Sequence, residues 1–392
     1  MWYWVDTDRF GSLRLLASTE ENSTTNRHFA LLGALIAITI GTFVLTRSLA
    51  AHVRDLRQDD GRAWYARAQA ALAEGRVADA ASAFRRAAAT DPQDRRYQLA
   101  LGGALAAGGR RGEARAVLLA LGTGHPDDPE VGLHLARLEA AEGHSDEAFR
   151  HYRNTLTALW SADQTEARRH VRVEFIELLL QRGLTARALS ELLVLSPGVP
   201  DDPAARIEVG SMFLRAGDAQ RARELFVSVL ERDAGNVAAL AGAGKAAFAL
   251  GDYAAARRWL ATVPDEGDAA ELRAVSNLVL TADPLAPRLS FEDRRRRADM
   301  TLAHARSVLD ACGVRAADAG LPAGDLAALS GEQAALAALL SGSGALPSRE
   351  TIDRAFDFAY RIERSVGQAC PEAGPLGRAI LLIGRRHGLD EP

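Results

Sequence analysis

The stretch EGRVADAASAF (residues 74–84) returns in altered form as LGDYAAARRWL (residues 250–260). Both stretches carry a glycine that is followed five residues later by an alanine. The same pair occurs at six places, with the glycines at Gly75, Gly109, Gly143, Gly183, Gly217 and Gly251. Successive glycines are 34, 34, 40, 34 and 34 residues apart. The chain therefore contains an internal repeat of about 34 residues.

Two further positions recur with each glycine. A large apolar or aromatic residue stands nine residues after it, as in Phe84, Leu118, Tyr152, Leu192, Phe226 and Leu260. A small residue stands seven residues before it in every copy except the fourth, which has Ile176. This pattern predicts two antiparallel helices, because glycine ends a helix in the left-handed conformation and small residues let two helix axes approach. The large residue is expected to fill the space between one helix pair and the next.

The pattern resembles the tetratricopeptide repeat family, with six repeats that begin at residues 61, 95, 129, 169, 203 and 237. The resemblance implies an all-α tetratricopeptide-repeat superhelix over residues 61–270. Three features depart from the family: its early tryptophan is kept only as Trp64, Ile176 replaces a small residue, and LTALWSADQTE (residues 156–166) adds six residues to the third repeat. We expect looser packing and a longer helix pair there, with Trp160 tucked against an extra solvated turn.

The resemblance also implies a concave groove that is lined by the first helix of each repeat and binds a segment of another protein. The expected groove residues are Arg62, Tyr65, Gln69, Arg96, Leu99, Leu133, His134, Arg137, His170, Val173, Glu174, Glu177, Ile207, Glu208, Ser211 and Lys245. They are basic at the start of the groove and acidic in its middle. This mixture favours an extended or helical ligand held by apolar contacts, with charges that set its register. The alternative is that these charges only keep an inner face soluble.

Other functional classes find no support in the sequence. The net charge of −4 argues against a general nucleic-acid binder. Five histidines fall between residues 125 and 170, but no metal-ligand spacing accompanies them, so we predict no metal and no cofactor. No nucleophile elbow or phosphate-binding loop occurs either. We therefore predict that the chain is not an enzyme.

An apolar segment precedes the repeats. FALLGALIAITIGTFVLT (residues 29–46) has no charged residue and is close to the length that crosses a bilayer. We predict an uncleaved transmembrane signal anchor at residues 29–50, between an N-terminal tail (residues 1–28) and a linker (residues 51–60). A cleavable signal peptide that ends near Ala50 is the alternative.

The orientation of this anchor follows from its position more than from its charges. Arginines flank the segment on both sides, so the positive-inside rule discriminates little. We expect a single pass through a bacterial inner membrane, with the N-terminus inside and the repeats in the periplasm. Gly33, Ala37 and Gly41 share one face of the span and predict possible self-association.

Residues 271–392 lose the glycine register and predict a C-terminal helical domain. Its helices are expected near residues 290–312, between the glycine-rich breaks at 320 and 341–344, at 349–368 and at 375–387. Cys312 and Cys370 fit one disulfide in an oxidising compartment, and two buried thiols are the alternative.

These features together predict a membrane-anchored scaffold or adaptor. Its repeats would bind another envelope protein during assembly, secretion or maturation. The alternative is a permanent structural subunit of a bacterial membrane protein complex.

Overall fold

The computed structural model describes residues 14–265, 267–319, 323–342, 347–365 and 374–389. Within these ranges the chain is helical throughout and has no strand, which confirms the predicted all-α class. It divides into two compact units, Met1–Val171 and Arg172–Pro392.

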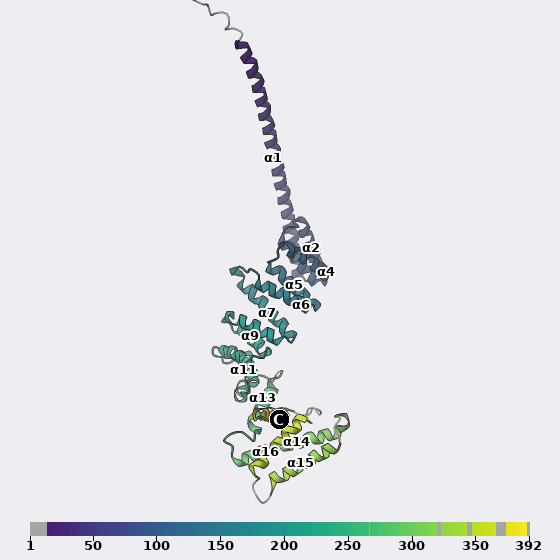
Figure 1. Ribbon diagram of the computed structural model, residues 1–392, viewed down its shortest axis with the longest axis vertical. Helices are drawn as coiled ribbons and strands as arrows, with labels where there is room; N and C mark the ends of the chain where they lie inside the picture. The colour runs from purple at the N-terminus through teal and green to yellow at the C-terminus, as the bar shows by residue number, and fades with distance from the viewer. Residues whose placement is uncertain (1–13, 266, 320–322, 343–346, 366–373, 390–392) are drawn as a thin grey trace, which may run out of the picture. The chain divides into compact units, whose positions relative to one another are not determined.

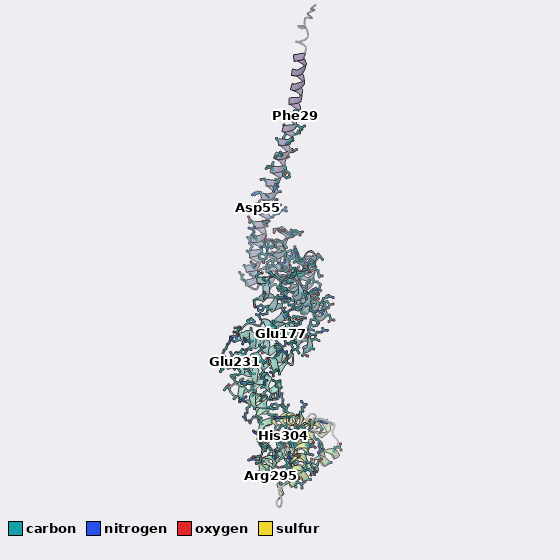
Figure 2. The ribbon with its side chains drawn as sticks, turned by 60° about the vertical axis from the view of Figure 1, so that its left-hand side comes forward. Phe29, Asp55, Glu177, Glu231, Arg295 and His304 are labelled. Atoms are coloured by element: carbon teal, nitrogen blue, oxygen red, sulfur yellow. The ribbon has the colours of Figure 1, made fainter. Side chains whose placement is uncertain are left out.

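Helix α1 (Arg14–Ala73) is continuous over 60 residues and leaves the helix pairs of the first unit as a single rod (Figure 1). Residues 31–50 are all exposed, and Figure 2 shows Phe29 and Asp55 projecting from the rod. Packing begins at Gly61, which is buried against Thr90 and Tyr97. Residues 51–60, the predicted linker, are helical because residues 42–60 contain neither glycine nor proline.

The helices that follow α1 come in pairs, as the repeat predicts. The first unit contains α2 (Val77–Thr90), α3 (Arg95–Ala107), α4 (Arg111–Gly124), α5 (Pro129–Glu142) and α6 (Ser145–Thr157). Helix α7 (Thr165–Gln181) carries the chain into the second unit. There α8 (Thr185–Leu195), α9 (Pro203–Arg215), α10 (Ala219–Leu230), α11 (Val237–Ala249) and α12 (Tyr253–Leu260) follow.

The six repeat glycines have φ between +70° and +92°, so each turn uses the left-handed conformation that the sequence predicts. The alanines five residues later are all fully buried, and the large residues at the ninth position are at most 2% exposed. The pattern in the sequence is therefore the pattern of helix contacts.

The large residues pack differently from the simple expectation. A Cβ atom on Gly244 would lie 2.5 Å from Leu260, and one on Gly102 would lie 2.7 Å from Leu118, so the large residue first fills the space inside its own pair. Phe226 does both, because it touches Gly210 of its own pair and Gly242 of the next. The large residue was predicted to fill the space between pairs. Phe226 does so, but it also fills the space inside its own pair.

Four first helices begin at a capping side chain that the sequence analysis missed. Asp94, Asp128, Asp202 and Asn236 each accept a hydrogen bond from a backbone N–H in the first turn, at 2.9 to 3.1 Å. Each stands nineteen residues after a repeat glycine, so the signal was present in the same register.

The predicted insertion forms a short irregular connection after α6. It includes the 3-10 turn η1 (Ala162–Gln164) before α7, which has 17 residues. The Trp160 indole N–H donates to the Thr155 carbonyl at 2.8 Å, so the ring is partly tucked as expected, whereas Leu159 is 86% exposed.

The second unit ends in five more helices. They are α13 (Ala269–Ala282), α14 (Phe291–Ala319), α15 (Ala323–Ser341), α16 (Arg349–Ser365) and α17 (Pro375–Arg386). Ser290 caps α14, because its hydroxyl accepts a hydrogen bond from the Asp293 N–H at 3.1 Å. Val275 and Val279 of α13 share an apolar core with Tyr360, Ile380 and Ile383.

The arginine run at residues 294–297 is engaged within the second unit. Arg294 donates to the Pro284 carbonyl at 2.9 Å, and Arg297 donates to the carbonyls of Leu280 and Asp283 at 3.1 and 3.0 Å. Two of the four arginines therefore bind the end of α13 and the turn after it.

Cys312 is fully buried in the core between α14 and α16. Cys370 lies outside the described residues, so the predicted pairing of the two cysteines stays a prediction.

Candidate protein-binding groove

The sixteen predicted groove residues all lie on the first helix of a pair, and none of them is buried. In the first unit they come from α1, α3, α5 and the start of α7. In the second unit they come from the rest of α7, α9 and α11. Seven of the sixteen side chains are exposed and nine are half-buried, so all of them are at least partly accessible.

We call the part of the groove formed by α1 and α3 its first end. Aromatic side chains gather there. The Tyr65 ring is half-buried, with its centroid 5.3 Å from Phe84 and 5.4 Å from Tyr97. Burial raises the pKa of the Tyr97 phenol, so this ring stays neutral in the physiological range. Arg96 lies over Tyr97, with its guanidinium 5.8 Å from the ring centroid. Apolar rings beside a cation can hold an apolar side chain that has an acidic neighbour.

Trp64, the family tryptophan, does not join this surface. Its ring lies between Arg67 and Arg86, whose guanidinium carbons are 4.7 and 4.4 Å from the ring centroid. The side chain therefore links α1 to α2 through stacked cations.

Two groove charges in the second unit form ion pairs with other residues of that unit. Glu177, labelled in Figure 2, accepts two hydrogen bonds from Arg215 at 2.7 and 3.1 Å, and Arg215 lowers the pKa of its carboxyl. Lys245 lies 2.6 Å from Asp268. These contacts favour a partly structural role for both charges.

Arg215 and Asp268 are not among the groove residues that the repeat pattern predicts. Glu177 and Arg215 are 38 residues apart, which is one repeat plus about one helical turn. Residues at that spacing on consecutive first helices come together, so the repeat length itself was the signal that could have found the pair.

Glu139, Glu142 and His144 bring three possible metal-ligand atoms within 4.8 Å of one another. Arg115 occupies this cluster: it donates to Glu139 twice at 2.9 Å and also to Glu142. The His144 Nδ1 atom is 2.8 Å from Glu139. A metal ion would have to displace the guanidinium, so the group is better described as an ion network that joins α4 to α5.

A cavity of about 480 Å³ lies between the second and third repeats, beside the start of the inserted residues. Its lining includes Leu119 and Val131 together with the polar side chains of His151 and Asn154. Burial lowers the pKa of His151, so its imidazole is neutral at pH 7. The Thr155 hydroxyl is buried without a hydrogen-bond partner and faces Gly132, where a Cβ atom would lie 2.4 Å away.

Comparison with known proteins identifies the repeat in the sequence. One tetratricopeptide repeat profile matches residues 71–138 and 213–278, and a second matches residues 45–95 and 174–235. No curated protein sequence matches the chain.

Solved structures with similar folds share little sequence with this chain. Pseudomonas aeruginosa pilF is 15% identical, with a TM-score of 0.40 over 52% of this chain and 90% of its own. A tetratricopeptide repeat protein from Parabacteroides merdae is 13% identical, with a TM-score of 0.40 over 61% of this chain and 91% of its own. PilW, described as a widely conserved type IV pilus biogenesis factor, is 16% identical, with a TM-score of 0.39 over 51% and 90%.

The two family profiles together cover five of the six repeat glycines and the buried alanines that follow those five. The chain belongs to the tetratricopeptide repeat family.

Proposed function

We propose that this protein is a membrane-anchored scaffold whose repeats hold another envelope protein during assembly, secretion or maturation. Its membership of the tetratricopeptide repeat family makes it a protein-interaction scaffold rather than an enzyme. The membrane anchor, the compartment and the kind of partner are our proposal.

The exposed apolar stretch of α1 carries the proposal. Residues 31–50 are exposed all round the helix, and Leu31, Leu35, Ile38 and Leu45 are each more than 60% exposed. Water is a poor environment for such a surface, whereas a bilayer would remove it from water at about 25 cal/mol per Å². One described helix meets the length and composition of a membrane span, a test that a signal sequence near the N-terminus also passes.

We place the anchor at residues 29–50 of an inner membrane, with the repeats and the C-terminal helices in the periplasm. A reporter pair fused to the C-terminus tests this topology: alkaline phosphatase should be active and a cytoplasmic reporter inactive. The opposite result would refute the periplasmic location. The mass of the mature protein separates an anchor from a cleaved signal peptide.

The ligand surface that we propose is the exposed side of the first helices. Leu99, Leu133, Val173 and Ile207 supply half-buried apolar area along it. Charged groove residues that are not bound to a neighbouring repeat would set the register of the ligand. Substituting Leu99 and Leu133 by Asp should abolish partner capture. The same change at Ala116 and Ser82, exposed on second helices, should not.

Purification in mild detergent distinguishes a transient scaffold from a permanent subunit. A stable complex buries a larger and more apolar interface, so a stoichiometric partner that survives salt washes would indicate the subunit. A partner that is recovered only after cross-linking would support the scaffold.

Self-association through Gly33, Ala37 and Gly41 is a further part of the proposal. Replacing Gly41 by Ile should reduce cross-linked dimers in the membrane if the three small residues form the contact. Replacing Leu35, which lies on the opposite face of the helix, by Ile should leave the dimers unchanged.

A further inference from the structure

The first end of the groove and the apolar stretch belong to one helix. Residues 51–60 of α1 are helical and, apart from Ala51, exposed. The packed segment that begins at Gly61 is locked to the repeats, because Ala68 and Ala71 are buried against them. A short helix that continues from helical segments at both ends has no nucleation cost to meet. The connection is therefore a strut and not a flexible tether.

The length of this strut sets the distance between the membrane surface and the first end of the groove. At about 1.5 Å per residue, Tyr65 lies about 22 Å and Gln69 about 28 Å beyond Ala50, the end of the proposed anchor. An extended chain covers 28 Å in about nine residues. A ligand residue at this end of the groove can therefore come from a segment about ten residues outside the bilayer.

The chemistry at this height is suited to one kind of segment. Tyr65 offers a half-buried ring that is supported by Phe84 and Tyr97. The side chains of Arg62 and Arg96 are 68% and 69% exposed, and each forms an ion pair with an aspartate on its own helix or next to it. Such surface pairs are weak and can exchange for a ligand carboxylate.

We propose that the first end of the groove binds the membrane-proximal segment of another membrane protein. An aliphatic or aromatic side chain of that segment packs on Tyr65, and a neighbouring carboxylate pairs with Arg62 or Arg96. This inference rests on the proposed anchor and on the proposed groove.

The strut is tested first without a partner. The full chain is reconstituted in phospholipid nanodiscs with a fluorescent amino acid at position 69, and energy transfer to labelled lipid headgroups reports the height. Duplicating residues 52–58 adds seven residues, which keeps the helix face and raises Gln69 by about 10 Å. Replacing the same seven residues by Gly and Ser should broaden the distances. An unchanged distance after duplication, or a broad distribution in the natural chain, would overturn the strut.

The partner is then tested in native membranes with benzoylphenylalanine at position 69, and with the same probe at Ser82 on α2 as the control. The expected adduct at position 69 is an integral membrane protein that is joined within about ten residues of its own span. In the variant with residues 52–58 duplicated, the cross-linked residue of the partner should lie about three residues further from the partner's span.

The outcomes separate this inference from the proposed function. An adduct with a soluble protein at position 69 would overturn the membrane-proximal partner and leave the scaffold standing. An adduct at Ser82 but none at position 69 would overturn both. Replacing Tyr65 by Ala should reduce the adduct at least tenfold, and a Phe substitution should restore it, because Phe keeps the ring.

Discussion

Gly102, Gly210 and Gly244 are places where a side chain would collide with the large residue of the same repeat. Each lies inside a helix, where glycine costs about 0.5–1 kcal/mol relative to alanine. The close approach of Leu118, Phe226 and Leu260 offsets that cost through buried apolar contact. At this scale the fold depends on the absence of a methyl group.

Replacing Gly244 by Ala should lower the free energy of unfolding by about 1–3 kcal/mol, because the new Cβ atom would lie 2.5 Å from Leu260. Gly112 is the matched control: it is also helical, and a Cβ atom there would meet nothing within 4 Å. The Gly112→Ala variant should be neutral or slightly more stable. Urea unfolding followed by circular dichroism measures both, and equal effects would contradict the packing argument.

The Arg115 network predicts an acid-dependent stability. Arg115 is the main cause that lowers the pKa of the Glu139 carboxyl, and a hydrogen bond from His144 adds to it. A carboxyl with a lowered folded pKa stabilises the fold above its unfolded pKa of about 4.3, and the contribution is lost as pH falls through the folded pKa. The Arg115→Met variant should therefore be less stable than the natural chain at pH 7, and this difference should shrink toward pH 3.

Arg111 lies exposed on the same helix and supplies the control. The Arg111→Met variant should unfold like the natural chain at both pH values. A difference for Arg115→Met that stays constant from pH 7 to pH 3 would show that the side chain acts by packing alone.

Helix α1 contains both the exposed apolar stretch and the first helix of the repeats. Residues 31–50 present apolar side chains to the outside on every face of the helix, and its last part is the first helix of the repeat array. The change occurs within one continuous helix, because glycine and proline are absent from residues 42–60. Gly61 itself is packed against Tyr97, so the helix is fixed where the repeats begin.

A charge in the middle of the proposed span tests the anchor. Ile38→Arg should lower the fraction that resists carbonate extraction, because arginine at the centre of a bilayer helix costs about 2.5–3.5 kcal/mol on insertion scales. Leu56→Arg makes the same chemical change on the same helix outside residues 29–50 and should have no effect. If both variants stay in the membrane fraction, another part of the chain holds it there.

At the scale of the whole molecule, much of the fold could be predicted from the glycine register. The positive φ values, the buried alanines and the C-terminal helices near residues 290, 349 and 375 all follow the sequence interpretation. The continuity of α1 through residues 51–60 was not predicted. A charged segment that joins two helices and has no visible packing partner resembles a linker in the sequence. The Glu177–Arg215 pair was missed because it needs the distance between consecutive helices, which no single repeat contains.

The predicted disulfide concerns the C-terminal helices as a group. If Cys312 and Cys370 are paired, the denatured oxidised chain should have no free thiol, and reduction should release two. The bond would close a loop of nearly 60 residues and stabilise the fold by about 2–4 kcal/mol, so replacing both cysteines by Ser should lower the unfolding midpoint. Two free thiols in the denatured, unreduced protein would establish the buried-thiol alternative.

The contacts at the end of α13 decide where the chain can be cut. The side chains of Arg294 and Arg297 hold carbonyl groups at and after the end of α13, and Val275 and Val279 of that helix are covered by α16 and α17. A fragment that stops at residue 289 would expose this apolar surface and leave those carbonyls to water. We expect such a fragment to aggregate, whereas one that ends at residue 389 should stay monodisperse in detergent. The last repeat and the helices after it should therefore be expressed together, although the repeat pattern itself ends near residue 270.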